Sequence, residues 1–138
     1  MNKYNEEQNI FEKAKAIYLN RAMHIAATEE RLRALLVKAS LKWKELSQNP
    51  TFAQVRYQLE VFIRMIRAHV NKQYAGLSNR SLGLLVLGLF YFALPTDFVP
   101  DFIPFVGYVD DITVLLAIFK SLQSDIERFL EWEKERQV

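Results

Sequence analysis

Four aspartates within fifteen positions have the clearest potential for chemistry in this chain: Asp97, Asp101, Asp110 and Asp111. Carboxylate oxygens are the ligands that Mg²⁺ and Ca²⁺ prefer, so the four residues are candidate ligands of a divalent metal-binding protein or a metal-dependent hydrolase. The alternative is structural. Asp97 and Asp101 would bind backbone amides in turns, and Asp110 and Asp111 would complement the positive end of a following helix. Because the loop spacing of calcium sites is absent, we favour the structural interpretation and predict no cofactor, with Mg²⁺ or Ca²⁺ as the alternative.

Other residue types offer less chemistry. The chain has no cysteine, which excludes a disulfide framework, a zinc ribbon, an iron–sulfur cluster and a cysteine nucleophile. Its two histidines, His24 and His69, have no second histidine four residues away, so neither forms a local metal pair. We find no glycine-rich phosphate loop, no nucleophile elbow and no Ser–His–Asp order. The sequence therefore predicts no catalytic residue and favours a protein that is not an enzyme.

The aspartates belong to a segment, residues 94–111, that is unusual in itself. It repeats Asp-Phe-Val-Pro as Asp-Phe-Ile-Pro, and each proline holds the preceding residue in an extended conformation. The segment contains eight large apolar residues, and exposing all of them to water would lose on the order of 10 kcal/mol of burial free energy. We therefore expect this rigid loop to be buried against the helices, a partner or a membrane interface. The eight residues are Phe98, Val99, Phe102, Ile103, Phe105, Val106, Tyr108 and Val109.

Hydrophobic periodicity of three to four residues predicts helices that position this segment. The fourth is distinct, because residues 81–96 carry no charge and are apolar all round, which is typical of a bundle core or of lipid. Sixteen residues reach about 24 Å, less than the ~30 Å hydrocarbon core of a bilayer. We therefore expect an all-α single domain, residues 1–138, of about five helices with an apolar central fourth helix and a Pro/Asp-rich loop before the last helix. The expected helices lie near residues 6–26, 29–47, 50–74, 79–94 and 109–136.

Charge is distributed unevenly along the chain. Residues 1–80 hold 14 Lys or Arg against 7 Glu, whereas residues 81–138 hold 4 Lys or Arg against 9 Asp or Glu. No nucleic-acid-binding motif accompanies the basic half, so we favour a solvated helix face over nucleic-acid binding, with anionic lipid headgroups as the alternative partner of the same charges. Asp125 is expected to be an ordinary surface charge. The polar N-terminus does not resemble a signal peptide, so we expect a protein that is not secreted and lies on the cytoplasmic side, associated with a membrane.

A longer motif spans the same segment, and the sequence around it resembles a known family. The pattern Tyr-x₃-Pro-x-Asp-x₂-Pro-Asp-x₂-Pro-x₂-Gly-Tyr-x-Asp-Asp resembles the hallmark of the domain of unknown function 1232, the YkvA-like family, with a core over about residues 75–120. One departure is Leu94, where the family usually has serine. The motif residues are Tyr91, Pro95, Asp97, Pro100, Asp101, Pro104, Gly107, Tyr108, Asp110 and Asp111.

The resemblance implies a small helical domain, frequently membrane-associated, with no established activity and no catalytic residues. Together with the apolar loop it predicts an uncharacterised, non-enzymatic interaction or scaffold module. Its expected partners are a membrane surface or a protein, and a homo-oligomer is a further option. Nucleic-acid binding through the basic N-terminal half is the weakest alternative.

Overall fold

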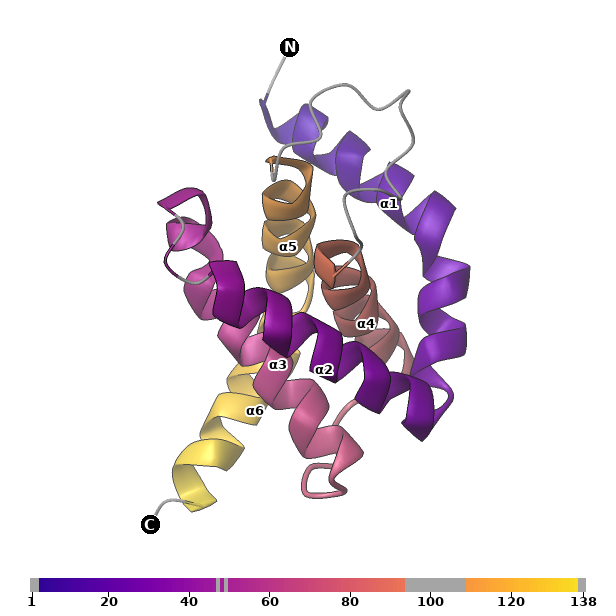
Figure 1. The fold of residues 1–138 in the computed structure, drawn as a ribbon, viewed down its shortest axis with the longest axis vertical. Coiled ribbons are helices and arrows are strands. Elements are labelled where there is room, and N and C mark those ends of the chain that lie inside the picture. Colours follow the sequence, from indigo (N-terminus) through magenta and orange to yellow (C-terminus); the bar gives the residue numbers. More distant parts are fainter. Residues whose placement is uncertain (1–2, 47, 49, 94–108, 137–138) are drawn as a thin grey trace.

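The computed structural model describes the backbone of residues 3–46, 48, 50–93 and 109–136. Within these ranges it leaves out the side chains of residues 3–8, 46, 51, 52, 54, 91 and 109–111. The described residues form six α-helices and one 3₁₀ helix, with no strand among them (Figure 1). The predicted all-α fold is confirmed, with six helices where about five were expected. The elements are α1 (Lys3–Ala26), α2 (Glu29–Leu46), η1 (Pro50–Val55), α3 (Arg56–Val70), α4 (Asn79–Ala93), α5 (Val109–Ser121) and α6 (Gln123–Arg136).

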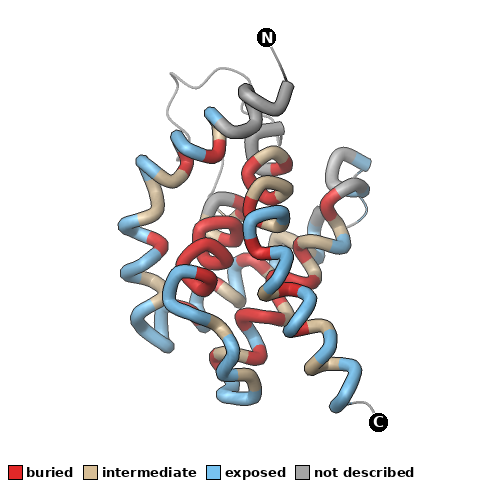
Figure 2. The backbone as a smooth tube through the Cα atoms, turned by 180° about the vertical axis from the view of Figure 1, so that it is seen from behind, coloured by how far each residue is buried: buried red, intermediate tan, exposed pale blue. Residues whose placement is uncertain are grey.

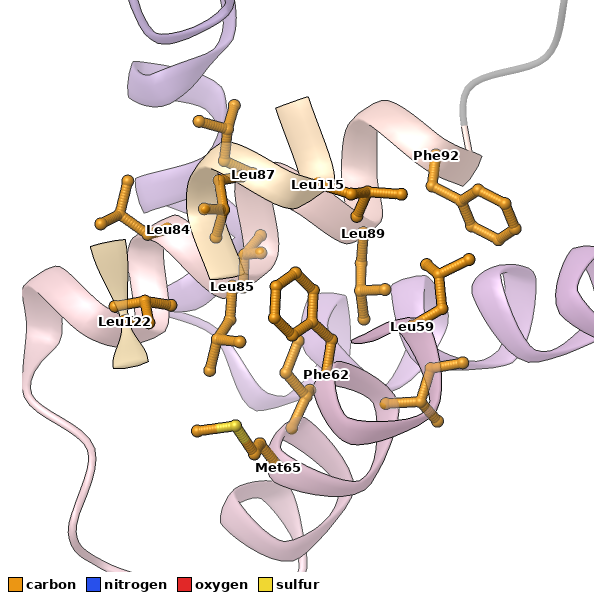
Figure 3. Close-up of a cluster of buried hydrophobic side chains, with 14 of the residues drawn as sticks. Leu59, Phe62, Met65, Leu84, Leu85, Leu87, Leu89, Phe92, Leu115 and Leu122 are labelled. Atoms are coloured by element: carbon orange, nitrogen blue, oxygen red, sulfur yellow. The ribbon is translucent and has the colours of Figure 1, made fainter. Parts of the chain in front are cut away.

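Helix α4 is the centre of the fold, as its uncharged sequence predicts. Residues 81–89 are all buried, and α4 contacts α1, α2, α3 and α5. Figure 2 shows this burial concentrated in the middle of the molecule, with exposed residues on the surrounding helices. In Figure 3 the leucines of α4 lie among Leu59 and Phe62 of α3 and Leu115 of α5, all of them fully or almost fully buried. The surrounding helices are amphipathic, and they bury their apolar faces against this helix.

A polar network fixes the start of α4. The Ser78 hydroxyl accepts a hydrogen bond from the Ser81 backbone N–H at 3.1 Å, which caps the helix. The buried Ser81 hydroxyl donates to the Asp125 carboxylate of α6 at 2.8 Å. Asp125 also pairs with Arg128. The expectation that Asp125 is an ordinary surface charge is therefore wrong, because this carboxylate joins α6 to the first turn of α4.

Several helix ends differ from their expected positions. The helix expected over residues 50–74 consists of η1 and α3, and the chain leaves α3 through Asn71 and Lys72. Lys72 has a φ of 59°, so this lysine is the left-handed residue after α3. Between α1 and α2, the Thr28 carbonyl accepts the Leu32 N–H at 3.0 Å and begins α2.

The helix expected over residues 109–136 is interrupted at Leu122. The backbone ladder still crosses the interruption, because the Leu122 N–H donates to the Ile118 carbonyl and the Ile126 N–H donates to the Leu122 carbonyl, each at 2.9 Å. Helix α5 packs against α1 and α4, whereas α6 is joined to α3 by the Arg64–Glu133 ion pair. No helix in the described part of the chain is long and apolar enough to cross a membrane.

The close packing of α4 leads to a prediction about its two glycines. A β-carbon at Gly88 would lie 3.2 Å from Ile118 Cδ1, 3.3 Å from Phe62 Cε2 and 3.4 Å from Leu115 Cδ2, all on buried side chains of α3 and α5. Overpacking costs about 1–3 kcal/mol, more than the ~1 kcal/mol of helix propensity that alanine gains over glycine. We therefore expect Gly88→Ala to lower the free energy of unfolding by about 1 kcal/mol in urea denaturation.

Gly83→Ala is the matched control. A β-carbon there would meet the sulfur of Met23, a flexible and partly exposed side chain that can move aside. This variant should keep or raise the stability of the wild type. Equal stability of the two variants would contradict the prediction, since it would mean that α3 and α5 can move away from α4.

Candidate functional site

The structure describes the two ends of the predicted motif but not its middle. Tyr91 lies in the last turn of α4, and Asp110 and Asp111 lie in the first turn of α5. Their side chains are outside the described ones, so the structure does not test whether the four aspartates converge. The same holds for the remaining motif residues, which fall within residues 94–108: Pro95, Asp97, Pro100, Asp101, Pro104, Gly107 and Tyr108.

Helix α1 packs against both helices that border this segment. At the end of α4, Phe92 is fully buried. At the start of α5, Ile112, Val114 and Leu115 are buried in the same core. Both ends of the motif are therefore anchored in one hydrophobic core.

Aromatic side chains at the end of α4 meet cationic side chains from α1 and α2. The Phe90 ring contacts Tyr18 edge-on at 5.8 Å between ring centroids, and the Arg21 guanidinium carbon lies 5.9 Å from the Phe90 centroid. The Lys42 ammonium lies 5.3 Å from the Phe92 ring centroid. Cation–π contacts of this kind contribute about 0.5–1 kcal/mol at exposed sites. The end of α4 thus combines apolar rings with positive charge.

A cavity of about 230 Å³ opens beside this end of α4, between α1 and α2. Its floor is apolar, and two cations, Arg31 and Lys38, lie at its wall without any acidic residue in the lining. The apolar lining residues are Ile25, Ala34, Leu35, Phe90 and Ala93.

The outer face of α2 continues the same combination of apolar and basic groups. Val37 and Leu41 are 59% and 63% exposed, although both are large aliphatic residues. Residues 31–44 contain five Lys or Arg and no acid, and Arg33 bonds back to Glu29 at 3.1 Å. In Figure 1, α2 crosses the front of the molecule with this side uncovered. We call the exposed residues Arg31, Val37, Lys38, Leu41 and Lys44 the α2 face.

Sequence reasoning did not identify the α2 face. The signal was present, because Val37 and Leu41 are spaced four apart and lie on the side of the helix opposite the buried Leu32 and Ala39. Arg21 was also overlooked, because nothing in the sequence around it indicates a contact with Phe90.

No metal centre is found among the residues whose side chains are described, since no three of their His, Cys, Asp or Glu side chains form a group that could hold an ion. His24 and His69 are included in that search. The metal alternative depends on the four aspartates and stays a prediction.

A test that separates the two interpretations uses the first turn of α5. If Asp110 and Asp111 complement the helix dipole, Asp110→Asn and Asp111→Asn should each lower the free energy of unfolding by about 0.5 kcal/mol at low salt, and less in ~0.5 M NaCl. The structural interpretation expects about 5 mM MgCl₂ to leave the melting temperature of the wild type unchanged. A rise that both variants abolish would contradict it, and Glu131→Gln is a control for loss of a carboxylate elsewhere.

Comparison with known proteins identifies the segment around the motif. Residues 81–117 match the model of the family described as "Protein of unknown function (DUF1232)". The chain is 28% identical over 74 residues to the "Uncharacterized membrane protein YkvA" of Bacillus subtilis (strain 168), an alignment that covers 54% of this chain and 70% of the relative. No solved structure matches the chain. The resemblance inferred from the motif is confirmed: residues 81–117 are similar to the DUF1232, or YkvA-like, family.

Proposed function

We propose that this protein is a non-enzymatic interaction or scaffold module, acting as one domain, that associates reversibly with the cytoplasmic surface of an anionic membrane. The observation that carries the proposal is the α2 face, where Val37 and Leu41 are exposed on a stretch of helix that has five cations and no acid. Amphipathic helices bind membrane surfaces through this combination. The name of the Bacillus subtilis relative, a membrane protein, supports the same direction.

The magnitudes are sufficient for reversible association. Burying the exposed parts of Val37 and Leu41 contributes about 2–3 kcal/mol, and each cation near an anionic surface adds about 1 kcal/mol. With Arg31, Lys38 and Lys44 the total binding free energy is about 5 kcal/mol. This is enough for reversible association, but neither the apolar nor the electrostatic contribution is enough alone.

The second element of the proposal concerns the Pro/Asp-rich motif. We propose that it presents the apolar residues of segment 94–111 to the membrane or to a protein partner, next to the end of α4. The aromatic and cationic groups around Phe90 support this, because rings with an adjacent cation suit the boundary between headgroups and acyl chains.

Vesicle flotation tests the proposal directly. The wild type should float with phosphatidylcholine vesicles that contain about 30% phosphatidylglycerol and should bind pure phosphatidylcholine much less. Arg31→Gln combined with Lys38→Gln should weaken binding about 30-fold, because two cations are lost, and Arg31→Lys with Lys38→Arg should preserve it. Val37→Ser combined with Leu41→Ser should weaken binding by a similar factor.

Ile17→Ser is the matched control, because Ile17 is 58% exposed but lies on α1, away from the basic stretch. Its binding should stay within about twofold of the wild type. All of these positions are exposed, so melting temperatures should change little. An equal loss in the Ile17 variant, or equal binding to neutral vesicles, would refute the α2 face as the attachment site.

A further inference from the structure

A second cavity lies between α3 and α6 and is lined by residues outside the matched segment 81–117. Its volume is about 350 Å³, in the range of small-molecule sites. We call it the α3–α6 cavity. The lining residues that matter here are Arg64, Arg67, Gln73, Trp132, Glu133 and Arg136.

One ion pair fixes the geometry of this cavity. The Arg64 Nε donates to Glu133 Oε2 at 2.9 Å, and its Nη2 donates to Oε1 at 3.1 Å. This bidentate pair is partly buried and joins α3 to α6. Because it occupies both oxygens of Glu133, that carboxylate is committed to Arg64.

Two further guanidinium groups line the cavity without a carboxylate of their own. Arg67 follows Arg64 by three positions and is exposed, and no ion pair joins its side chain to the described part of the chain. The guanidinium carbon of Arg136 lies 4.8 Å from the Trp132 ring centroid. A guanidinium over an aromatic ring keeps its in-plane N–H groups available for an anion. The cavity therefore has two positive charges in excess, and arginine stays protonated at any pH that the protein tolerates.

The aromatic wall of the cavity comes from Phe129 and Trp132, and Tyr74 packs against both rings without lining the cavity. The ring centroids of Phe129 and Trp132 are 5.5 Å apart, and Tyr74 contacts them at 5.2 and 5.0 Å. Phe129 is almost fully buried, and burial raises the pKa of the Tyr74 phenol. The half-buried Trp132 ring therefore provides the aromatic surface of the cavity, beside the Arg136 guanidinium.

We propose that the α3–α6 cavity binds a small organic anion in which a carboxylate or phosphate is attached to a planar apolar group. Arg67 and Arg136 would bind the anionic oxygens, with the Gln73 amide as a further donor, and the planar group would pack on the aromatic wall. A lipid headgroup offers the phosphate but not the adjacent ring. This proposal does not depend on membrane association.

Phenyl phosphate is the probe for a titration followed by the indole N–H signals in NMR spectra of the ¹⁵N-labelled full chain. We expect a saturable shift of the Trp132 signal with a dissociation constant of about 1 mM or below. Inorganic phosphate should bind at least about tenfold more weakly, and benzyl alcohol, which lacks the charge, should not saturate the site. Trp43 lines a different cavity, on the other side of Arg64 and Arg67. A shift of the Trp43 signal without one of Trp132 would therefore refute the assigned position.

Substitutions distinguish direct binding of phenyl phosphate by the cavity arginines from a general effect of net charge. Arg67→Gln and Arg136→Gln should each weaken phenyl phosphate binding about tenfold, whereas Arg31→Gln, with the same loss of charge on α2, should change it by less than about twofold. Equal weakening by all three variants would overturn the proposal, and so would the absence of a saturable Trp132 shift in the wild type.

Flotation distinguishes the two possible sources of the anion. Arg67→Gln and Arg136→Gln should leave binding to phosphatidylglycerol vesicles unchanged. Loss of vesicle binding in these variants, without binding of phenyl phosphate to the wild type, would assign the cavity to lipid and refute the small-anion site. Failure of the wild type to bind vesicles would refute the membrane proposal alone.

Discussion

The burial of nine consecutive residues of α4, residues 81–89, is the constraint on which the rest of the structure depends. A helix without a polar face must be covered on every side, and α1, α2, α3 and α5 together cover this one. Each covering helix turns its apolar stripe inward and its charged residues outward. The positions of the surface charges are therefore a consequence of how α4 is enclosed, and this places Arg31, Lys38 and Lys44 together on the α2 face.

The sequence was sufficient to predict the central helix, because an uncharged run needs a complete cover whatever the other helices do. It was not sufficient to predict the interruption at Leu122, since the apolar stripe and the backbone hydrogen bonds both continue across it. The direction of α6 is set instead by contacts between residues that are distant in sequence. Ser81 and Asp125 are 44 positions apart, and Arg64 and Glu133 are 69 apart. Periodicity carries no information about such pairs.

The candidate sites also differ in whether the sequence alone could predict them. The motif over residues 91–111 could be recognised from residue types and spacing alone, and this was enough to detect the resemblance to the DUF1232 family. The α2 face was readable in principle, because Val37 and Leu41 fall outside the buried stripe of their helix. The α3–α6 cavity could not be predicted from the sequence, since Arg67 and Trp132 belong to different helices that meet only because α6 turns away from α5. Its recognition requires the tertiary structure.

The formal net charge of +2 conceals two basic surfaces that arise for different reasons. On α2 the positive charge follows from local composition, because residues 31–44 contain no acid. On α3 and α6 the positive charge follows from pairing. Glu133, the acidic residue in the cavity lining, is paired with Arg64, so Arg67 and Arg136 have no carboxylate to pair with there. A count of charges along the sequence finds the first surface and misses the second. Within the second surface the Arg64–Glu133 pair cancels internally, so Arg64→Gln, which frees Glu133, would lower the excess in the cavity from two positive charges to one.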